Sequence, residues 1–301
     1  MASLPFDQPG RFWKGNLHAH STLSDGRLSP EEVCKLYAQE GYDFLSLTDH
    51  FLESYGWPLA DTRLCRTDAF TTILGAELHA GLTELGERWH ILAVGLPLDF
   101  APATADETGP EIAARALAAG AFVAAAHPNW YSLSEADILS LGRIDAIEIY
   151  NGVAVDHNDR GESWHIADVL LGKGHRYTAC ACDDYHTNPA NNDFGRGWVW
   201  VKSESLDPDA LVTALKAGHY YASTGPQIHD VHIEGDSIFI HCSPVERIWV
   251  TGIGSRTRRT NGSAITRAEF NLAEFNSPFC RVTIRDVFGR QAWTNPIWME
   301  G

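Results

Sequence analysis

The chain lacks any long uninterrupted hydrophobic run, although hydrophobic residues make up 44% of its 301 positions. A helix that crosses a bilayer needs about 20 consecutive, mostly apolar residues, so the sequence predicts no membrane span. The first ten residues also lack the basic and hydrophobic segments of a secretory signal. We therefore expect a cytoplasmic protein.

Cysteine is scarce and follows no metal-binding or redox spacing. The six cysteines include no Cys-x-x-Cys pair. A chain of this length can bury a core large enough to need no disulfide framework, and reduced thiols are the default in the cytoplasm. Disulfides are therefore not expected to hold this fold together.

Positive charge is the other shortage, because 23 Lys and Arg face 39 Asp and Glu, for a net charge of −16. Such a charge repels long polyanions, and the only basic cluster is Arg256, Arg258 and Arg259. Long DNA or RNA is thus an unfavourable partner, and an exonuclease is disfavoured. A small anionic substrate stays compatible, since bound divalent cations would offset the charge locally. The sequence does not indicate an oligomeric state.

The chain does contain a series of short apolar runs that end in His, Asp or Glu. The first ends in His18-Ala-His20, five residues before Asp25. The later residues of this kind are Asp49, His50, Glu77, His90, His127, Asp184 and His186. His90 differs from the others because it stands at the start of its run. Continuous apolar runs are typical of strands in parallel sheets, whose carboxyl ends carry the chemistry. We therefore expect these side chains to converge on a metal site.

Helix signals alternate with the apolar runs. Capping residues and terminal glycines predict helices over 31–40, 111–119, 134–141, 162–171 and 208–217. Strand–helix alternation over about 220 residues predicts an α/β fold with a parallel sheet, as a barrel of about seven strands. Segments 51–69 and 98–109 show little pattern and are expected to be loops over the mouth of the site.

After Pro226 the pattern changes to short alternating strands separated by turns rich in Gly, Asp, Asn, Ser and Pro. The strands are predicted over 228–234, 238–242, 248–251 and 282–285. The predicted domains are accordingly a barrel over residues 1–226 and a small β-rich domain over residues 227–301.

The motif order H-x-H, Asp, T-D-H, G-x-E, H-I-L, A-H-P and D-x-H resembles the polymerase and histidinol phosphatase (PHP) superfamily. These motifs span His18 to His186. The resemblance implies a distorted (β/α)7 TIM-like barrel with two or three metal ions. It further implies that one metal is held by His18, His20, Glu77 and Asp184. Glu77 would bridge to a second metal on His90 and His127, and a third would lie on Asp25, His50 and His186.

Hydrolysis of a phosphoester on a small phosphorylated substrate is the natural interpretation of such a centre. The nucleophile would be a metal-bound hydroxide, because coordination lowers the pKa of water toward about 7. Mixed imidazole and carboxylate ligands suit Zn, Mn or Fe, and the sequence does not choose among them. Arg196 is the candidate residue for binding the substrate anion. The other interpretation is that Arg196 forms a salt bridge with a nearby acidic side chain. Asp49 could orient a metal ligand without binding the metal itself, or it could cap a loop.

Two alternatives remain open. The motifs around Gly195–Gly197 and Ala217–Pro226 loosely resemble a PHP branch that hydrolyses aryl carbamate esters. An ester, carbamate or amide hydrolase with the same metal centre is therefore the second hypothesis. A non-catalytic metal-binding barrel is the third. For Glu148 and Asn151, contact with substrate and a structural role are both open. His79 could compete as a ligand, but it is expected to be a neighbour of the site or a surface residue.

Overall fold

The computed structural model describes residues 4–188 and 192–299. Over these residues the chain forms six α-helices and three short 3-10 helices. The α-helices are α1 (Pro30–Gln39), α2 (Gly109–Ala118), α3 (Glu135–Ser140), α4 (Gly152–Asn158), α5 (Trp164–Gly172) and α6 (Pro208–Lys216). The 3-10 helices are η1 (Pro5–Asp7), η2 (Glu53–Tyr55) and η3 (Arg63–Cys65).

Sixteen strands within the described residues join into one extended sheet. The first ten are β1 (Arg11–Asn16), β2 (Phe44–Leu47), β3 (His50–Phe51), β4 (Thr71–Leu78), β5 (Ile91–Val94), β6 (Phe122–Ala125), β7 (Ala146–Asn151), β8 (Thr178–Cys182), β9 (Trp198–Ser203) and β10 (Tyr220–Ser223). The remaining six are β11 (Ile228–Glu234), β12 (Ser237–Thr251), β13 (Thr257–Asn271), β14 (Phe279–Arg285), β15 (Gln291–Thr294) and β16 (Ile297–Trp298).

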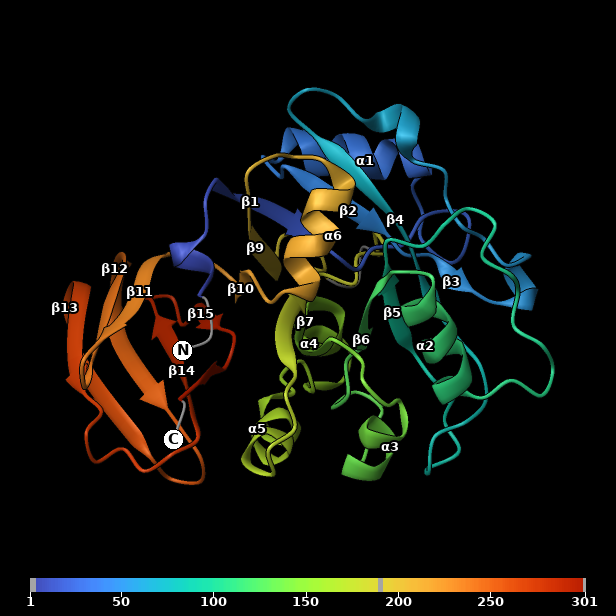
Figure 1. Ribbon diagram of the computed structural model, residues 1–301. Coiled ribbons are helices and arrows are strands. Elements are labelled where there is room, and N and C mark those ends of the chain that lie inside the picture. Colours follow the sequence, from blue (N-terminus) through green and yellow to red (C-terminus); the bar gives the residue numbers. More distant parts are fainter. Residues whose placement is uncertain (1–3, 189–191, 300–301) are drawn as a thin grey trace.

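The strand order along the main path is β11-β12-β14-β15-β10-β9-β1-β2-β4-β5-β6-β7-β8. β1, β2 and β4 pair in parallel, and so do β6, β7 and β8. The helices lie around this mixed sheet, and the C-terminal strands stand to one side of them (Figure 1). The expected α/β class is therefore confirmed in the form of a mixed α/β fold.

β5 departs from the expected parallel arrangement, because it runs antiparallel to both β4 and β6. The connection from Leu78 to Ile91 contains no helix, and its chain turns back where the Thr83 N–H donates to the Glu87 carbonyl at 2.8 Å. A parallel neighbour would need a crossover, which is usually helical. The short turn therefore forces β5 to fold back on β4.

A closed (β/α)7 TIM-like barrel is not confirmed, since the sheet stays open between β1 and β8. Both edges of β1 are occupied, by β2 and by the antiparallel β9. In the described part of the chain, the segments that contain β1 and β8 are hydrogen-bonded beyond their strand ends. There the His20 N–H donates to the Tyr185 carbonyl at 2.8 Å and the Asp184 N–H donates to the His18 carbonyl at 3.0 Å. These bonds draw the carboxyl ends of β1 and β8 together.

The helices predicted from capping signals are confirmed to within a few residues. Ser29, Thr108 and Ser134 each accept a hydrogen bond from the backbone N–H three residues on, and an acidic side chain returns the bond. The Asp207 side chain caps α6 by accepting hydrogen bonds from the backbone N–H groups of Asp209 and Ala210. α4 was not predicted, because its short sequence follows the strand without a break and is capped by Asn151, a residue at the strand end.

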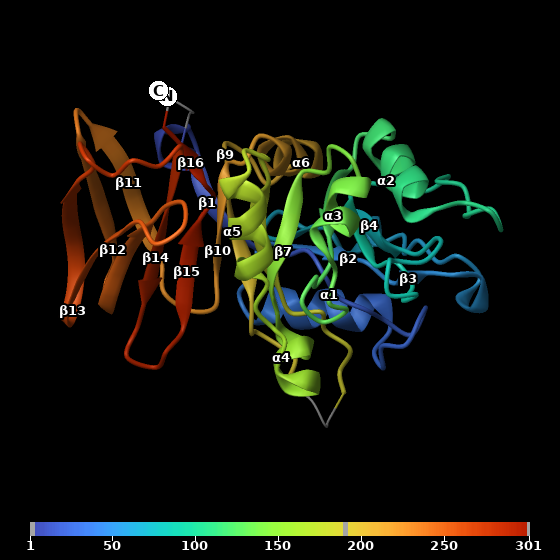
Figure 2. The ribbon, with the colours of Figure 1, turned by 90° about the horizontal axis from the view of Figure 1, so that it is seen from below.

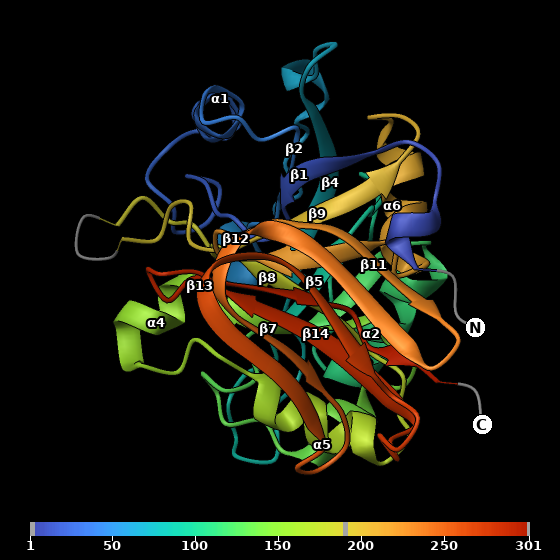
Figure 3. The same ribbon diagram turned by 90° about the vertical axis from the view of Figure 1, so that its left-hand side faces the viewer.

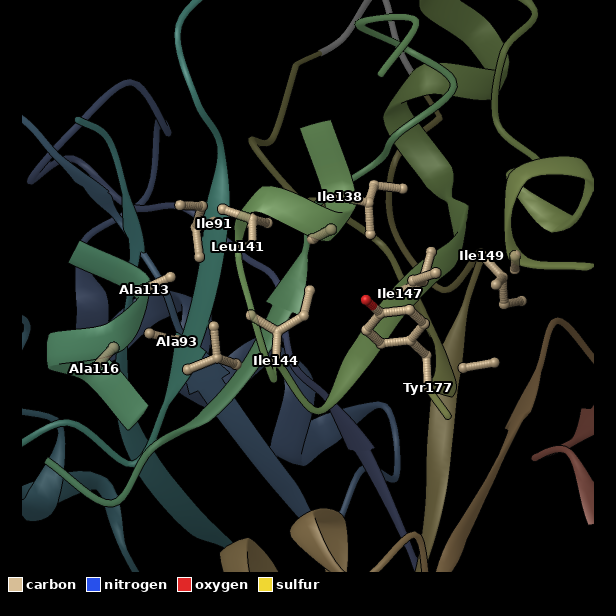
Figure 4. Close-up of a cluster of buried hydrophobic side chains, with 14 of the residues drawn as sticks. Ile91, Ala93, Ala113, Ala116, Ile138, Leu141, Ile144, Ile147, Ile149 and Tyr177 are labelled. Carbon is tan, nitrogen blue, oxygen red and sulfur yellow. The ribbon is translucent and has the colours of Figure 1, made fainter. Parts of the chain in front are cut away.

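Apolar side chains fill both sides of the sheet. On one side, α2, α3 and α5 bury Ile112, Ile138 and Leu170 against β5–β8, and Figure 4 shows part of this cluster. On the other side, Leu211 and Leu215 of α6 pack with buried residues of the strands. This rigid packing holds the strand ends, and therefore the polar residues that follow them, in fixed positions.

The C-terminal strands form the β-rich part that the sequence predicts. β11 has the predicted bounds, whereas segments 238–242 and 248–251 are parts of the single long strand β12, and 282–285 lies inside β14. β13 was missed because its side chains are exposed or half-buried and mostly polar. Figure 3 views these strands in front of the helical part. The domain boundary at Pro226 stays a prediction.

No helix within the described ranges has the length and apolar character needed to cross a bilayer. The cytoplasmic location stays a prediction.

Candidate metal centre

The nine candidate ligands gather at one edge of the sheet, although their sequence positions span 169 residues from His18 to His186. His18 and His20 follow β1, His127 follows β6, and Asp184 and His186 follow β8. His90 precedes β5. Because β5 is reversed, its amino end lies at the same edge as the carboxyl ends of the parallel strands. The unusual position of His90 at the start of its run is thereby explained.

Glu77 of β4 is the centre of the cluster. Its carboxylate lies within 3.7 Å of a ring nitrogen of six histidines. His90 Nδ1 is 2.7 Å and His127 Nε2 is 3.2 Å from Oε1. Such a carboxylate, with histidines around both oxygens, has the geometry needed to bridge two cations.

Two further carboxylates each draw histidines together. Asp184 Oδ1 is 3.3 Å from His18 Nε2 and 3.0 Å from His20 Nε2. Asp25 is 3.5 Å from His50 Nε2 and 3.3 Å from His186 Nε2. The side chains therefore fall into three overlapping groups around Glu77, Asp184 and Asp25, and each group offers mixed imidazole and carboxylate donors.

Exposure separates the two sides of the cluster. The side chains of His18, His20 and Glu77 are at most 1% exposed. His50, His90 and His186 are 15 to 18% exposed, and Asp25 is 42% exposed. The cluster therefore opens to solvent on the side of these four residues, where a small molecule could reach the donors.

The surroundings of His18 fit a bound cation. Its Nδ1 lies 3.0 Å from Glu148 Oε1, and its buried Nε2 has no hydrogen-bond partner among the described residues. If Nδ1 donates to Glu148, a neutral ring presents the Nε2 lone pair to the carboxylates of Glu77 and Asp184. Lone pair and anions repel one another unless a cation or a proton lies between them.

Electrostatics in the metal-free protein supports the same view. Burial disfavours the charged forms of His20 and His90, and neighbouring histidines add to this effect. The pKa values of both residues therefore fall to about 3. Burial opposes the charge on Glu77, but His90, His50 and His18 outweigh it and hold the pKa of Glu77 well below its usual range. Glu77 is therefore an anion and His20 and His90 are neutral at pH 7, which are the forms that bind metal.

The backbone is strained at two of the candidate ligands. His127 and Asp184 have φ values of 29° and 57°, in the left-handed region that few non-glycine residues occupy. Such strain persists only where the surrounding contacts enforce it, and it collects at functional sites.

Binding of a divalent metal at pH 8 is expected to release about one proton or more per chain. Burial opposes a positive charge on His50, but Glu77 and Asp25 outweigh it and raise the pKa of His50 to about 10. A ligating ring is neutral, so His50 must lose its proton, and metal affinity should rise with pH until about 10. Calorimetry in two buffers with different ionisation enthalpies measures this release. Identical heats in both buffers would contradict it.

Asp49 and Arg196 lie outside the cluster of nine candidate ligands. Asp49 accepts hydrogen bonds from the Ser21 N–H, the Ser21 hydroxyl and the Ser24 hydroxyl at 2.6 to 2.7 Å. It therefore fixes the turn that leads to Asp25. Arg196 Nη1 is 3.6 Å from Asp156 and donates to the Asn192 carbonyl at 3.1 Å. These contacts favour the salt bridge over binding of the substrate anion, which stays a prediction.

Three buried neighbours support the candidate ligands. Glu148 accepts from the His127 N–H at 2.7 Å besides its bond with His18, and the Asn151 amide donates to Glu148 and Asp184 at 3.0 Å each. His79 Nε2 is 2.9 Å from His50 Nδ1, and its Nδ1 is 2.7 Å from the Trp89 carbonyl. These contacts support the structural interpretation of Glu148 and Asn151 and place His79 beside the site.

No family model matches the sequence, and no curated protein matches it. Among solved structures, a two-domain protein from Bacteroides vulgatus that contains a predicted PHP-like metal-dependent phosphoesterase is similar. The TM-score is 0.54 at 16% sequence identity, over 92% of each chain. At this identity the likeness establishes the fold alone. It extends over both the part of the chain that contains the helices and the C-terminal strands. The resemblance to PHP proteins is thus confirmed for the fold.

Two further structures cover 59% of this chain. One is a candidate metal-dependent phosphoesterase from Bifidobacterium adolescentis, with a TM-score of 0.43, 14% identity and 90% of its own chain covered. The other is an amidohydrolase from Chromobacterium violaceum with bound sulfate, with a TM-score of 0.44, 16% identity and 89% of its own chain covered.

Proposed function

We propose that this chain is a metal-dependent hydrolase, and specifically a phosphoesterase that acts on a small phosphorylated molecule. The observation that carries the proposal is the grouping of nine donors around Glu77, Asp184 and Asp25, with one side open to solvent. Two or three cations bound in such a site would supply a hydroxide at neutral pH and would stabilise the negative charge of the substrate.

The proposed ligand groups are those that the resemblance to PHP proteins implies. His18, His20, Glu77 and Asp184 form the first group, Glu77 with His90 and His127 the second, and Asp25, His50 and His186 the third. Zn, Mn and Fe all accept this donor set. The supporting residues keep the donors in place: Glu148 orients the His18 ring, Asn151 holds Asp184, and Asp49 holds the turn before Asp25.

We also propose that residues 1–226 are the hydrolase unit and residues 227–301 a separate β-rich unit. Every candidate ligand lies before Pro226, which supports this division. A small anionic substrate is proposed rather than a long nucleic acid, because the net charge of −16 repels extended polyanions.

The test is to purify the protein without chelator, measure metal per chain, and assay p-nitrophenyl phosphate, bis-p-nitrophenyl phosphate and an aryl carbamate. We expect two to three metals and turnover of a phosphate ester, both lost or greatly reduced in His20→Ala. The matched control is His165→Ala, because His165 is an exposed residue of α5.

Each other result has a distinct meaning. Turnover of the carbamate alone would keep the metal centre and change the substrate to an ester, carbamate or amide. Bound metal without any turnover would favour the non-catalytic metal-binding fold. Fewer than two metals per chain would contradict the proposed assignment of the ligands to two or three metal ions.

A further inference from the structure

The loop after β6 brings a tyrosine against two of the candidate ligands. The Tyr131 ring stacks on His90 with 4.5 Å between ring centroids and an interplanar angle of 26°. Its centroid is 5.3 Å from that of His127. His90 and His127 are the two histidines of the proposed second group, so Tyr131 flanks the part of the centre that surrounds Glu77.

The Tyr131 hydroxyl is an unused donor. Within residues 4–188 and 192–299 it has no hydrogen-bond partner, and the residue is only half-buried. Burial raises the pKa of the Tyr131 hydroxyl above its ordinary value, and the carboxylates of Glu77 and Asp184 add to this. The ring stacks on His90, which lies on the side of the cluster that opens to solvent. The ordinary pKa of about 10 for tyrosine keeps the proton on this hydroxyl at neutral pH.

The surrounding loop fixes the ring in this position. The Trp130 N–H donates to the His127 carbonyl at 3.0 Å, and the Leu133 N–H donates to the Pro128 carbonyl at 2.9 Å. The neighbouring Trp130 ring stacks on Tyr131, with 5.7 Å between ring centroids and an interplanar angle of 19°. A donor held in this way needs no rearrangement when charge develops beside it, which is the condition for effective electrostatic catalysis.

We propose that Tyr131 is a catalytic residue whose hydroxyl donates a hydrogen bond to the substrate oxygen that gains negative charge during hydrolysis. This inference rests on the proposed hydrolase function. No bond to tyrosine forms, and its proton stays on the phenol throughout. A hydrogen bond that strengthens as charge develops acts on the rate of turnover more than on substrate binding.

The test is Tyr131→Phe, which keeps the ring stack and removes only the hydroxyl. We expect kcat to fall about 100-fold, with KM changed by less than about threefold and with metal per chain and melting temperature unchanged. The matched control is Tyr177→Phe, because the Tyr177 ring also stacks on a histidine, His175, but lies just before β8, at the end of the strand opposite to the candidate ligands. It should retain the kcat of the unmodified protein.

The outcomes separate the inference from the proposed function. Wild-type turnover together with full kcat in Tyr131→Phe overturns the inference and leaves the hydrolase intact. Loss of metal in Tyr131→Phe also overturns it, since the hydroxyl would then support the centre and not the substrate. Absence of turnover in the wild-type protein overturns the proposed function, and the inference with it.

Discussion

Glu77→Gln is expected to lower kcat/KM by more than about 100-fold and to reduce the metal content per chain. Loss of residues that only orient ligands costs about 10- to 100-fold, and Glu77 is the side chain on which the donors converge. An amide keeps the size of the side chain but offers one neutral oxygen where the carboxylate offers two charged ones. His90 and His127, at 2.7 and 3.2 Å, would lose their shared anion.

The measurements are metal per chain by mass spectrometry and kcat/KM on the best substrate of the wild-type protein. Glu40→Gln is the matched control, because it makes the same chemical change at an exposed position beyond α1. Unchanged metal and activity in Glu77→Gln would exclude Glu77 as the central ligand.

Asp183→Ala is expected to lower the free energy of unfolding by about 3 kcal/mol or more. The Asp183 carboxylate is buried and accepts hydrogen bonds from the N–H groups of Gly195, Arg196 and Gly197 at 2.6 to 3.0 Å. The Tyr37 hydroxyl adds a fourth bond at 2.8 Å. Alanine leaves these donors without an acceptor, and each unsatisfied buried group costs about 1–3 kcal/mol.

Urea unfolding of metal-free protein measures this effect apart from any change at the neighbouring Asp184. Asp183→Asn, which keeps one acceptor oxygen, should fall between the wild-type protein and Asp183→Ala. Asp61→Ala is the control, since Asp61 lies on the surface, where it forms an ion pair with the nearby Arg63. Equal unfolding curves for Asp183→Ala and Asp61→Ala would contradict the prediction.

The sequence was sufficient to predict that the candidate ligands converge, because most of them lie at the end of a buried run that can be recognised locally, and His90 lies at the start of one. Helix positions were also predictable, since capping boxes such as that of Ser29 and Glu32 are local signals. Asp183 and Asp184 show the limit of such reasoning. They are adjacent in the sequence, yet one carboxylate binds the 195–197 segment and the other lies among the histidines.

Features that depend on distant parts of the chain were not predictable. The bond between His18 and Glu148 joins residues 130 positions apart. The reversal of β5 depends on how the 79–90 segment turns, and that reversal explains His90. The open sheet has a similar origin, because the pairing of β1 with β9 decides that β8 cannot close onto it.

The pairing of β9 and β10 with β1 also has a consequence for truncation. β10 is bonded on its far edge to β15, near the end of the chain, and Tyr221 of β10 packs into the C-terminal core. Removal of residues 227–301 would therefore uncover a row of backbone donors and acceptors together with an apolar surface. Such an edge invites pairing between molecules. The C-terminal strands cover this edge of β10, and a shortened chain without them is expected to self-associate.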